Sequence, residues 1–333
     1  DHRLGAQEAP PAIVSAFIGS QLTQLLDDLE VNIKHGKLMP ADKTALKLEI
    51  GRIPEALLDN TDRNRTSPFA FTGNKFELRA VGSSANCALP MTVLNTIMAE
   101  QLQLFKVSVD ARIKKGNSKD EAILKELQQL ISQSKAIRFE GNGYGEEWVK
   151  EAKKRGLSNL KNTPEALTVW GRKEVIDLFD KMNVLHPAEM AARQEVEYEK
   201  YVMNRKIEAN VAIDMARNTI LPAAISYQNF LLENIMGLEE VFGKEAKSMS
   251  IAQRDILTRT SSLINDLYAS IKNLRENKEK VNSRKTPSQI AEGYGEIITP
   301  ITEELGEICT KMEGLIDNEI WPLPKFQELL FTR

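Results

Sequence analysis

The spacing of hydrophobic residues in the front of the chain predicts one helix followed by a β-like stretch. From Val14 to Leu29 apolar residues recur every three or four positions, as on one face of an amphipathic helix, and Gly36 marks its end. Beyond Gly36 this spacing is lost. Residues 46–50 and 75–81 instead alternate apolar and polar side chains, as strands do. We therefore expect the strands of this chain to lie in this stretch alone.

Helical spacing dominates from Pro90 onward. One helix is predicted over 91–115, and Gly116 closes it. The next is predicted over 118–133, where Ser118 and Glu121 have the spacing of a capping box. Further helix starts are predicted where a threonine precedes a proline, at Thr163–Pro164 and Thr286–Pro287.

Two long helices are predicted in the second half of the chain. Residues 188–221 contain no glycine or proline, which allows a helix of about 50 Å at 1.5 Å per residue. Along it Met203, Ile207, Val211 and Met215 fall on one side, and we interpret them as a helix-packing surface rather than a cofactor site. Residues 249–283 carry a short heptad pattern. We expect these long helices to pack as antiparallel hairpins.

Composition is that of an ordinary globular protein. The 333 residues are 42% hydrophobic and 27% charged, and 44 Lys and Arg against 47 Asp and Glu give a net charge of −3. This balance argues against a nucleic-acid partner, and the absence of a long apolar run argues against a membrane partner. Cys87 and Cys309 are expected to be buried free thiols. A soluble cytoplasmic protein is predicted.

The candidate chemistry lies in the segment 75–79. In a strand, Lys75, Glu77 and Arg79 would share one face, while Phe76 and Leu78 would point into the core. A carboxylate between two cations could bind Mg²⁺ or Mn²⁺, and the cations could bind phosphate or a substrate carboxylate. Spacing alone leaves open the simpler alternative of a solvated strand face whose charges pair with each other.

Other polar features are given structural roles. The glycines of Gly141–Gly145 resemble a phosphate-binding loop only superficially, since no Gly-Lys-Ser/Thr follows, and a turn is favoured. His2, His35 and His186 are interpreted as capping or surface residues rather than metal ligands.

Two segments in the front of the chain contain longer motifs, HRLGAQEAPPAI at 2–13 and DNTDRNRTSPFAFTGNKFELR at 59–79. They are similar to catalytic motifs of type III glutamine synthetases and occur in the same order. The resemblance continues through 156–167 and 213–223 to WPLPKFQELLF at 321–331, which is similar to the family's C-terminus. It implies an α+β fold: residues 1–90 would be the C-terminal part of the catalytic barrel, with short antiparallel strands and helices, and 91–333 a large helical extension.

The resemblance also implies roles for individual residues. Arg3 would hold the glutamate substrate, and Glu8, on the flap that closes over it, would be a catalytic residue that helps to deprotonate ammonium. Arg65 would be catalytic through its contact with the transferred phosphate, and Lys75 would lie on the ATP side. In the type I form a further arginine stands at the position of Ala70, so that contact would be absent or supplied from elsewhere.

Glu77 would be a ligand of the divalent metal that faces ATP, and Arg79 would bind the glutamate side chain. The implied function is ATP-dependent ligation of ammonia to L-glutamate through γ-glutamyl phosphate, with ATP and Mg²⁺ or Mn²⁺ as cofactors. The family forms homo-oligomers of stacked hexameric rings, dodecamers, which implies the same here. The remaining metal ligands would lie upstream, so residues 1–333 alone are expected to be inactive.

Two alternatives stay open. The chain could be a non-enzymatic helical assembly or regulatory module that retains remnants of the barrel. It could also belong to a ligase that joins glutamate to an amine other than ammonia, because the motifs report glutamate phosphorylation better than they report the identity of the amine.

Overall fold

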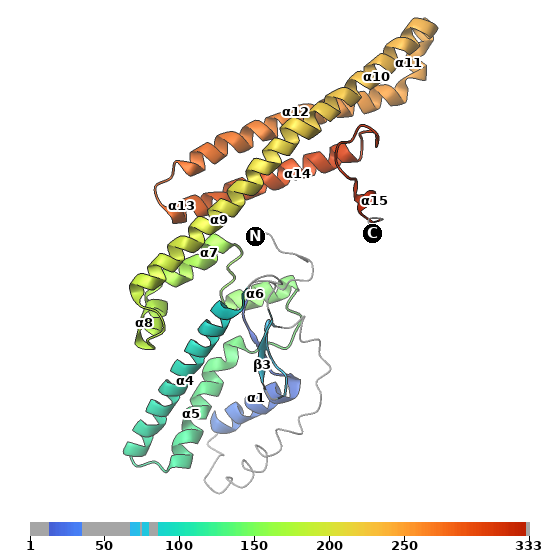
Figure 1. Ribbon diagram of the computed structural model, residues 1–333. Helices are drawn as coiled ribbons and strands as arrows, with labels where there is room; N and C mark the ends of the chain where they lie inside the picture. The colour runs from blue at the N-terminus through green and yellow to red at the C-terminus, as the bar shows by residue number, and fades with distance from the viewer. Residues whose placement is uncertain (1–12, 35–66, 74, 80–85, 331–333) are drawn as a thin grey trace. The chain divides into compact units, whose positions relative to one another are not determined.

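The structure is a computed structural model that describes residues 13–34, 67–73, 75–79 and 86–330. These residues are mainly helical and contain one three-stranded sheet (Figure 1), which agrees with the predicted α+β class. The chain divides into two compact units. The first unit comprises the chain up to Asn162 together with Val169–Met190. The second unit comprises Thr163–Thr168 and the chain from Ala191 onward. The predicted boundary near residue 90 separates a catalytic part from a helical extension, as the resemblance implies, and it stays a prediction.

The sheet of the first unit joins strands that are far apart in sequence. Its order is β1-β2-β3; β1 pairs with β2 in parallel, and β2 pairs with β3 antiparallel. Phe17 lies opposite Ala70 in the first pair, and both are almost fully buried. The strands are β1 (Ala16–Phe17), β2 (Phe69–Phe71) and β3 (Phe76–Leu78).

The first helix begins later than its apolar spacing predicts. Helix α1 spans Ser20–Lys34, and the residues just before it form β1 instead. Gly19 separates the two with a φ of +90°, in the left-handed region that breaks a helix. The Glu140 carboxylate accepts hydrogen bonds from the backbone N–H groups of Ile18 and Gly19, at 3.2 and 3.0 Å. The prediction of a helix from Val14, and of strands only beyond Gly36, was therefore wrong; Gly36 itself and residues 46–50 lie outside the described residues.

Helices α4 and α5 match their sequence signals closely. Helix α4 spans Ala88–Lys114 and ends before Gly116, whose φ is +96°. Helix α5 spans Lys119–Gln133, and its capping box of Ser118 and Glu121 is confirmed. The two helices are tied together by Glu126, which is buried and accepts hydrogen bonds from Ser108 and Arg112.

The first unit also contains two short helices, one of which carries an aromatic core. Trp148 is 3% exposed and stacks on Phe139 with ring centroids 3.6 Å apart. Ile13 and Ala152 are buried in the same cluster. The Gly141–Gly145 segment leads directly into the helix that carries Trp148, as expected of a turn. The helix that carries Trp148 is α6 (Glu146–Lys154), and the other short helix, α8 (Lys173–Lys181), packs against α4.

The second unit is built from long helices. Figure 1 shows α9 and α10 as one continuous rod, with α12 beside α10. The long helix predicted from Pro187 is confirmed, and it continues through Pro222 because a π-helical turn over Ala216–Ile220 precedes that proline. The helices are α7 (Thr163–Leu167), α9 (Pro187–Met215), α10 (Leu221–Phe242), α11 (Ala246–Met249), α12 (Ile251–Asn282), α13 (Pro287–Gly293), α14 (Thr299–Glu313) and α15 (Phe326–Leu329).

The core of the second unit follows the predicted heptad spacing. Thr260, Leu267, Ile271 and Leu274 of α12 are buried. Thr286 caps α13, since its hydroxyl accepts a hydrogen bond from the Gln289 N–H at 3.3 Å. The helix starts predicted at threonine-proline pairs are thus confirmed here, and α7 begins at Thr163 itself.

Two packing expectations were wrong. Met203, Ile207, Val211 and Met215 do share one side of α9, but between 37% and 55% of each is exposed, so they are not a packing surface within the described residues. Cys87 is exposed rather than buried, whereas Cys309 is partly buried and burial raises the pKa of its thiol. Among the described residues, no helix combines the length and the apolar character needed to cross a membrane.

Candidate active site

The predicted charged row lies on a short β-hairpin. The β2–β3 ladder is extended at its open end by a hydrogen bond from the Arg79 N–H to the Pro68 carbonyl, 2.6 Å long. At the other end the Thr72 N–H donates to the Lys75 carbonyl at 2.8 Å. Gly73, in the turn, has a φ of +101°, which glycine adopts without the strain that a side chain would add. The backbone thus fixes the spacing of the side chains on β3.

Glu77 is the centre of this row. Its carboxylate lies 2.8 Å from the Arg79 guanidinium and 3.3 Å from the Lys75 ammonium, so the three side chains do share one face. The hydrogen bond from Arg79, followed by that from Lys75, lowers the pKa of the Glu77 carboxyl. Glu77 is therefore ionised at neutral pH, as a metal ligand must be.

The predicted burial of Phe76 and Leu78 was wrong. Phe76 is 46% exposed and Leu78 is 37% exposed, so neither points into a core. Phe76 instead packs against Phe69, with ring centroids 4.9 Å apart. Glu77 lies opposite Ala70, which is fully buried. Because cross-strand partners share a face, the charged row borders the core and the aromatic side chains lie on the other side.

The donor set at the hairpin suits one position of a metal site. Glu77 supplies a hard carboxylate oxygen, the ligand type that Mg²⁺ and Mn²⁺ prefer. Over the described ranges, no group of three or more His, Cys, Asp or Glu side chains could hold a metal ion. The exposed ammonium of Lys75 and the guanidinium of Arg79 suit phosphate or carboxylate groups.

The other predicted site residues cannot be placed. Arg3, Glu8 and Arg65 lie outside the described residues, as do His2 and His35. Their roles stay predictions.

The third histidine has a structural position. The ring Nδ1 of His186 accepts a hydrogen bond from the Ala188 N–H at 3.3 Å, at the start of α9. The His186 N–H donates to the Glu189 carboxylate at 2.8 Å. These contacts confirm the interpretation of His186 as a capping residue.

Sequence reasoning missed the contacts that hold the hairpin to β1. The hydroxyl of Ser67 accepts hydrogen bonds from the Ser15 hydroxyl at 3.1 Å and from the Phe69 N–H at 3.2 Å. Both serines are buried. Ser15 gave no signal because its partner is 52 residues away, and a buried serine beside apolar residues is also typical of a helix interior.

Comparison with known proteins supports the resemblance found in the sequence. Residues 122–239 match the family model of the glutamine synthetase C-terminal domain. Over its whole length the chain is 46% identical to a glutamine synthetase of Bacteroides fragilis, 36% identical to the type-3 glutamine synthetase of Dictyostelium discoideum and 31% identical to a glutamine synthetase of Butyrivibrio fibrisolvens. It covers 46%, 45% and 46% of these proteins, so the chain spans about half the length of the curated relatives it matches. The resemblance seen in the motifs is thereby confirmed: over its full length the chain is similar to glutamine synthetases, including a type-3 enzyme, and residues 122–239 match the model of their C-terminal domain.

Proposed function

We propose that this chain is part of a glutamine synthetase, which joins ammonia to L-glutamate with ATP through γ-glutamyl phosphate. The observation that carries the proposal is the Lys75–Glu77–Arg79 row on β3, in a chain 46% identical throughout to a protein named glutamine synthetase. Residues 1–90 would complete the catalytic barrel, and the helices after them would form the extension. ATP and Mg²⁺ or Mn²⁺ would be the cofactors, and the enzyme would act in the cytoplasm.

The chemistry explains why charge must be neutralised at this hairpin. The γ-carboxylate of glutamate attacks the γ-phosphate of ATP, and these two anions repel each other. Arg79 would bind the glutamate carboxylate through its planar guanidinium, and Lys75 would face the nucleotide phosphates as a point charge. Glu77 would hold the divalent metal, which when bound supplies further positive charge. The ion pairs of Glu77 keep all three side chains aligned before the substrates bind.

The other proposed contributors are the residues carried over from the family motifs. Arg3 would bind glutamate, and Glu8 would help to deprotonate ammonium. Arg65 would stabilise the charge that develops on the transferred phosphoryl group. Ammonia would then displace phosphate from the acyl phosphate.

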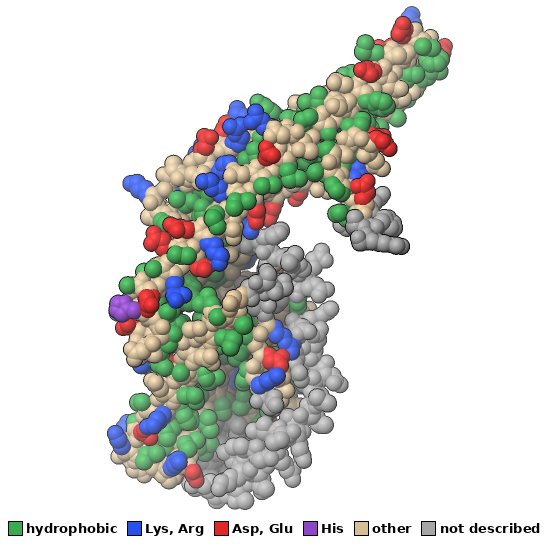
Figure 2. Space-filling view, in the orientation of Figure 1, with side chains coloured by type: hydrophobic (Ala, Val, Ile, Leu, Met, Phe, Trp, Pro, Cys, Tyr) green, Lys and Arg blue, Asp and Glu red, His purple; other side chains and the backbone are tan. Residues whose placement is uncertain are grey.

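A homo-oligomer of stacked hexameric rings is part of the proposal. It is supported by the apolar surface of α4, which Figure 2 shows in green. Several large apolar side chains of this helix are between 45% and 65% exposed, among them Met91, Met98, Leu102 and Val107. An exposed apolar surface of this kind marks an interface, either with the remainder of a longer chain or with another subunit.

The test uses the intact enzyme, that is, the longer chain that contains these residues. Glu77→Gln keeps the size of the side chain and removes its charge, so we expect glutamine formation to fall at least about a hundredfold while the circular dichroism spectrum is unchanged. The matched control is Glu197→Gln, which removes an exposed carboxylate of α9 from its ion pair with Lys200 and should leave the rate unchanged. A Glu77→Gln enzyme with wild-type rate and wild-type metal dependence would show that Glu77 is not the ligand.

A second measurement addresses the amine. Rates with ammonia and with methylamine or ethylamine as the only amine distinguish glutamine formation from ligation of another amine, and we expect ammonia to be preferred. Residues 1–333 alone should form no glutamine, because the proposed metal site needs ligands beyond Glu77. Glutamine formation by this purified chain would contradict that expectation.

A further inference from the structure

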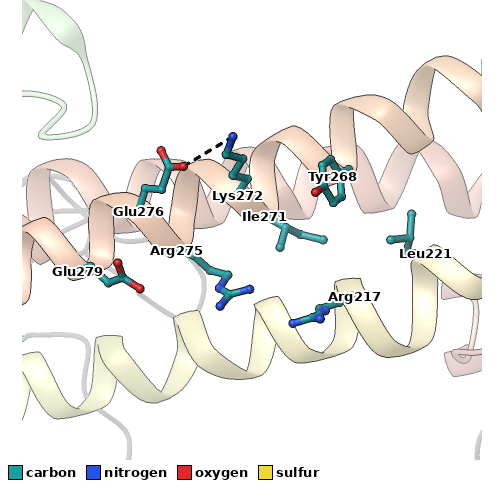
Figure 3. Close-up of a pocket in the computed structure, with 8 residues that line it drawn as sticks. All are labelled: Arg217, Leu221, Tyr268, Ile271, Lys272, Arg275, Glu276 and Glu279. Carbon is teal, nitrogen blue, oxygen red and sulfur yellow. Dashed lines mark ion pairs between the residues drawn. The ribbon is translucent and has the colours of Figure 1, made fainter.

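A pocket of about 320 Å³ lies between α12 and the π-helical turn that joins α9 to α10. Figure 3 shows Ile271, Arg275, Arg217 and Leu221 in the space between the helices, whereas Lys272 and Glu276 extend from the other side of α12. Ile271, which is 5% exposed, and Leu221 form an apolar floor. The volume is at the lower end of the range for small-molecule sites, about 300–1,000 Å³. It therefore suits a small ligand.

Two arginines converge on this pocket from different helices. Arg217 belongs to the π-helical turn, and Arg275 belongs to α12. In Figure 3 both guanidinium groups extend into the space between the helices. Within the part of the chain that the structure describes, neither guanidinium has a hydrogen-bond or ion-pair partner. Like charges that face one pocket without a carboxylate partner favour an anion between them.

The acidic residues of the pocket leave a net positive charge. Glu276 is paired with Lys272 on the same helix at 3.9 Å, as the dashed line in Figure 3 marks. Glu279 is the remaining carboxylate of the lining, so the five charged lining residues sum to three positive and two negative charges. Nearby, burial followed by the charges of Arg275 and Lys206 lowers the pKa of Lys278. Burial is the largest cause of this shift, and the two neighbouring cations add to it.

The π-helical turn explains how Arg217 comes to face α12. Pro222 has no N–H to donate, so the helix before it cannot keep its ordinary hydrogen-bond pattern. A π turn accommodates the proline by adding one residue to the turn, which rotates the preceding side chains by about 100° relative to a regular helix. Turns of this kind occur frequently at functional sites.

From these observations we propose that the pocket binds a small oxyanion ligand, through a phosphate or carboxylate group held between Arg217 and Arg275. The planar guanidinium groups match such oxyanions in a bidentate manner. Tyr268, which is 64% exposed at the pocket, borders the site. The apolar floor would contact the carbon portion of an organic ligand. This site is separate from the charged row on β3 and does not depend on the proposed enzymatic activity.

The test is isothermal titration calorimetry of the full chain with inorganic phosphate and, separately, with succinate, at constant ionic strength. Saturable binding of one anion per chain is expected. Tighter binding of phosphate would point to a phosphorylated ligand, and tighter binding of succinate to a dicarboxylate. Each of Arg217→Gln and Arg275→Gln should weaken binding at least about tenfold, and the double variant should abolish it. Arg275→Lys keeps the charge without the planar fork and should weaken binding less than Arg275→Gln.

Arg259→Gln is the matched control, because Arg259 is an exposed arginine of the same helix that does not line the pocket. It should bind both anions as the wild type does. All the substituted arginines are exposed, so the variants should keep the wild-type circular dichroism spectrum and urea midpoint. The proposal is overturned if neither anion gives saturable heat up to about 10 mM, a very weak affinity on the usual scale. It is equally overturned if the double variant still binds, or if Arg259→Gln loses binding as fully as the pocket variants do.

Discussion

Ala70 and Glu77 lie opposite each other in the β2–β3 ladder, so the central carboxylate of the charged row shares a face with a fully buried methyl group. Ala70 also lies opposite Phe17 of β1, which is 1% exposed. A small side chain at position 70 therefore lets the three strands close around the core while Glu77 remains at its edge. The position of the carboxylate depends on the size of its neighbour as well as on its own ion pairs.

Enlarging this neighbour should destabilise the first unit. Ala70→Leu inserts extra carbon atoms into a fully packed position, and overpacking of this kind costs about 1–3 kcal/mol. Urea unfolding followed by circular dichroism should show a lower midpoint. Ala111→Leu, at an exposed position of α4, makes the same chemical change without overpacking and should alter the unfolding free energy by less than about 0.5 kcal/mol. Equal effects of the two substitutions would argue that Ala70 is not tightly packed.

The ion pairs of Glu77 predict a dependence of stability on pH. Arg79 and then Lys75 lower the pKa of this carboxyl below its ordinary value of 4.5. A carboxyl with a lowered pKa in the folded state stabilises that state above its unfolded pKa, and this contribution is lost as the pH falls through the folded pKa. The difference in urea midpoint between the wild type and Glu77→Gln should therefore be constant above about pH 5 and shrink below 4.5.

The Arg79→Gln background provides the control for this prediction. Because the hydrogen bond from Arg79 is the largest cause of the shift, the pKa of Glu77, measured by carboxyl NMR titration, should rise in that variant. The pH dependence of the Glu77→Gln effect should become weaker as well. An unchanged Glu77 titration in Arg79→Gln would show that the pair at 2.8 Å does not persist in solution.

Trp148 should be the most sensitive core position of the first unit. It is 3% exposed, stacks on Phe139 and lies 5.4 Å below the Arg155 guanidinium. Trp148→Ala should cost about 3–5 kcal/mol, a large part of the total stability of a domain. Trp148→Phe retains an aromatic ring on Phe139 and should cost roughly 1–2 kcal/mol. Thermal unfolding followed by circular dichroism measures both, and a Trp148→Ala midpoint equal to that of Trp148→Phe would exclude the stacked ring pair as a major contribution.

The helices of this chain were predictable because their signals are local. The Ser118–Glu121 capping box, Gly116 and the Thr286–Pro287 pair each act within one turn of the helix end that they define. The heptad spacing of α12 likewise identified its buried side. Each of these predictions needed only the sequence of the segment that it concerned.

The elements that sequence reasoning missed depend on distant partners. The apolar spacing of Val14 to Leu29 fits a helix throughout, yet residues 16–17 pair with a strand more than 50 residues away. Glu140 caps the start of α1 from 121 residues away. Tertiary contacts overrode local preference in each case.

The candidate site, too, was predictable only where its signal is local. The alternation of residues 75–79 correctly placed Lys75, Glu77 and Arg79 on one face, because side chains of a strand alternate. Which face borders the core is decided by Ala70 on the neighbouring strand. Sequence spacing within β3 contains no information on that neighbour, and the expected burial of Phe76 and Leu78 failed for this reason.

Two glycines of the second unit should respond in opposite ways to the same substitution. Gly306 lies on an exposed side of α14, and a Cβ atom there would meet no other atom within 4 Å. Gly306→Ala should therefore stabilise the protein by about 0.5–1 kcal/mol, because glycine costs conformational entropy in a helix. At Gly293, at the end of α13, a Cβ would lie 2.7 Å from the Val281 Cγ1 atom and 2.9 Å from the Arg284 Nη1 atom.

Gly293→Ala can be accommodated only if α12 and α13 move apart, because Val281 is 1% exposed and has no space to yield. The overpacking cost of about 1–3 kcal/mol exceeds the helix-propensity gain, so we expect a lower urea midpoint for Gly293→Ala and a higher one for Gly306→Ala. Val281→Ala removes the two methyl groups that cause the clash. The double variant Gly293→Ala/Val281→Ala should then be more stable than the sum of the single effects, since the two substitutions share one contact. Additive effects, or stabilisation by Gly293→Ala, would mean that α12 and α13 do not approach each other as closely as the structure places them.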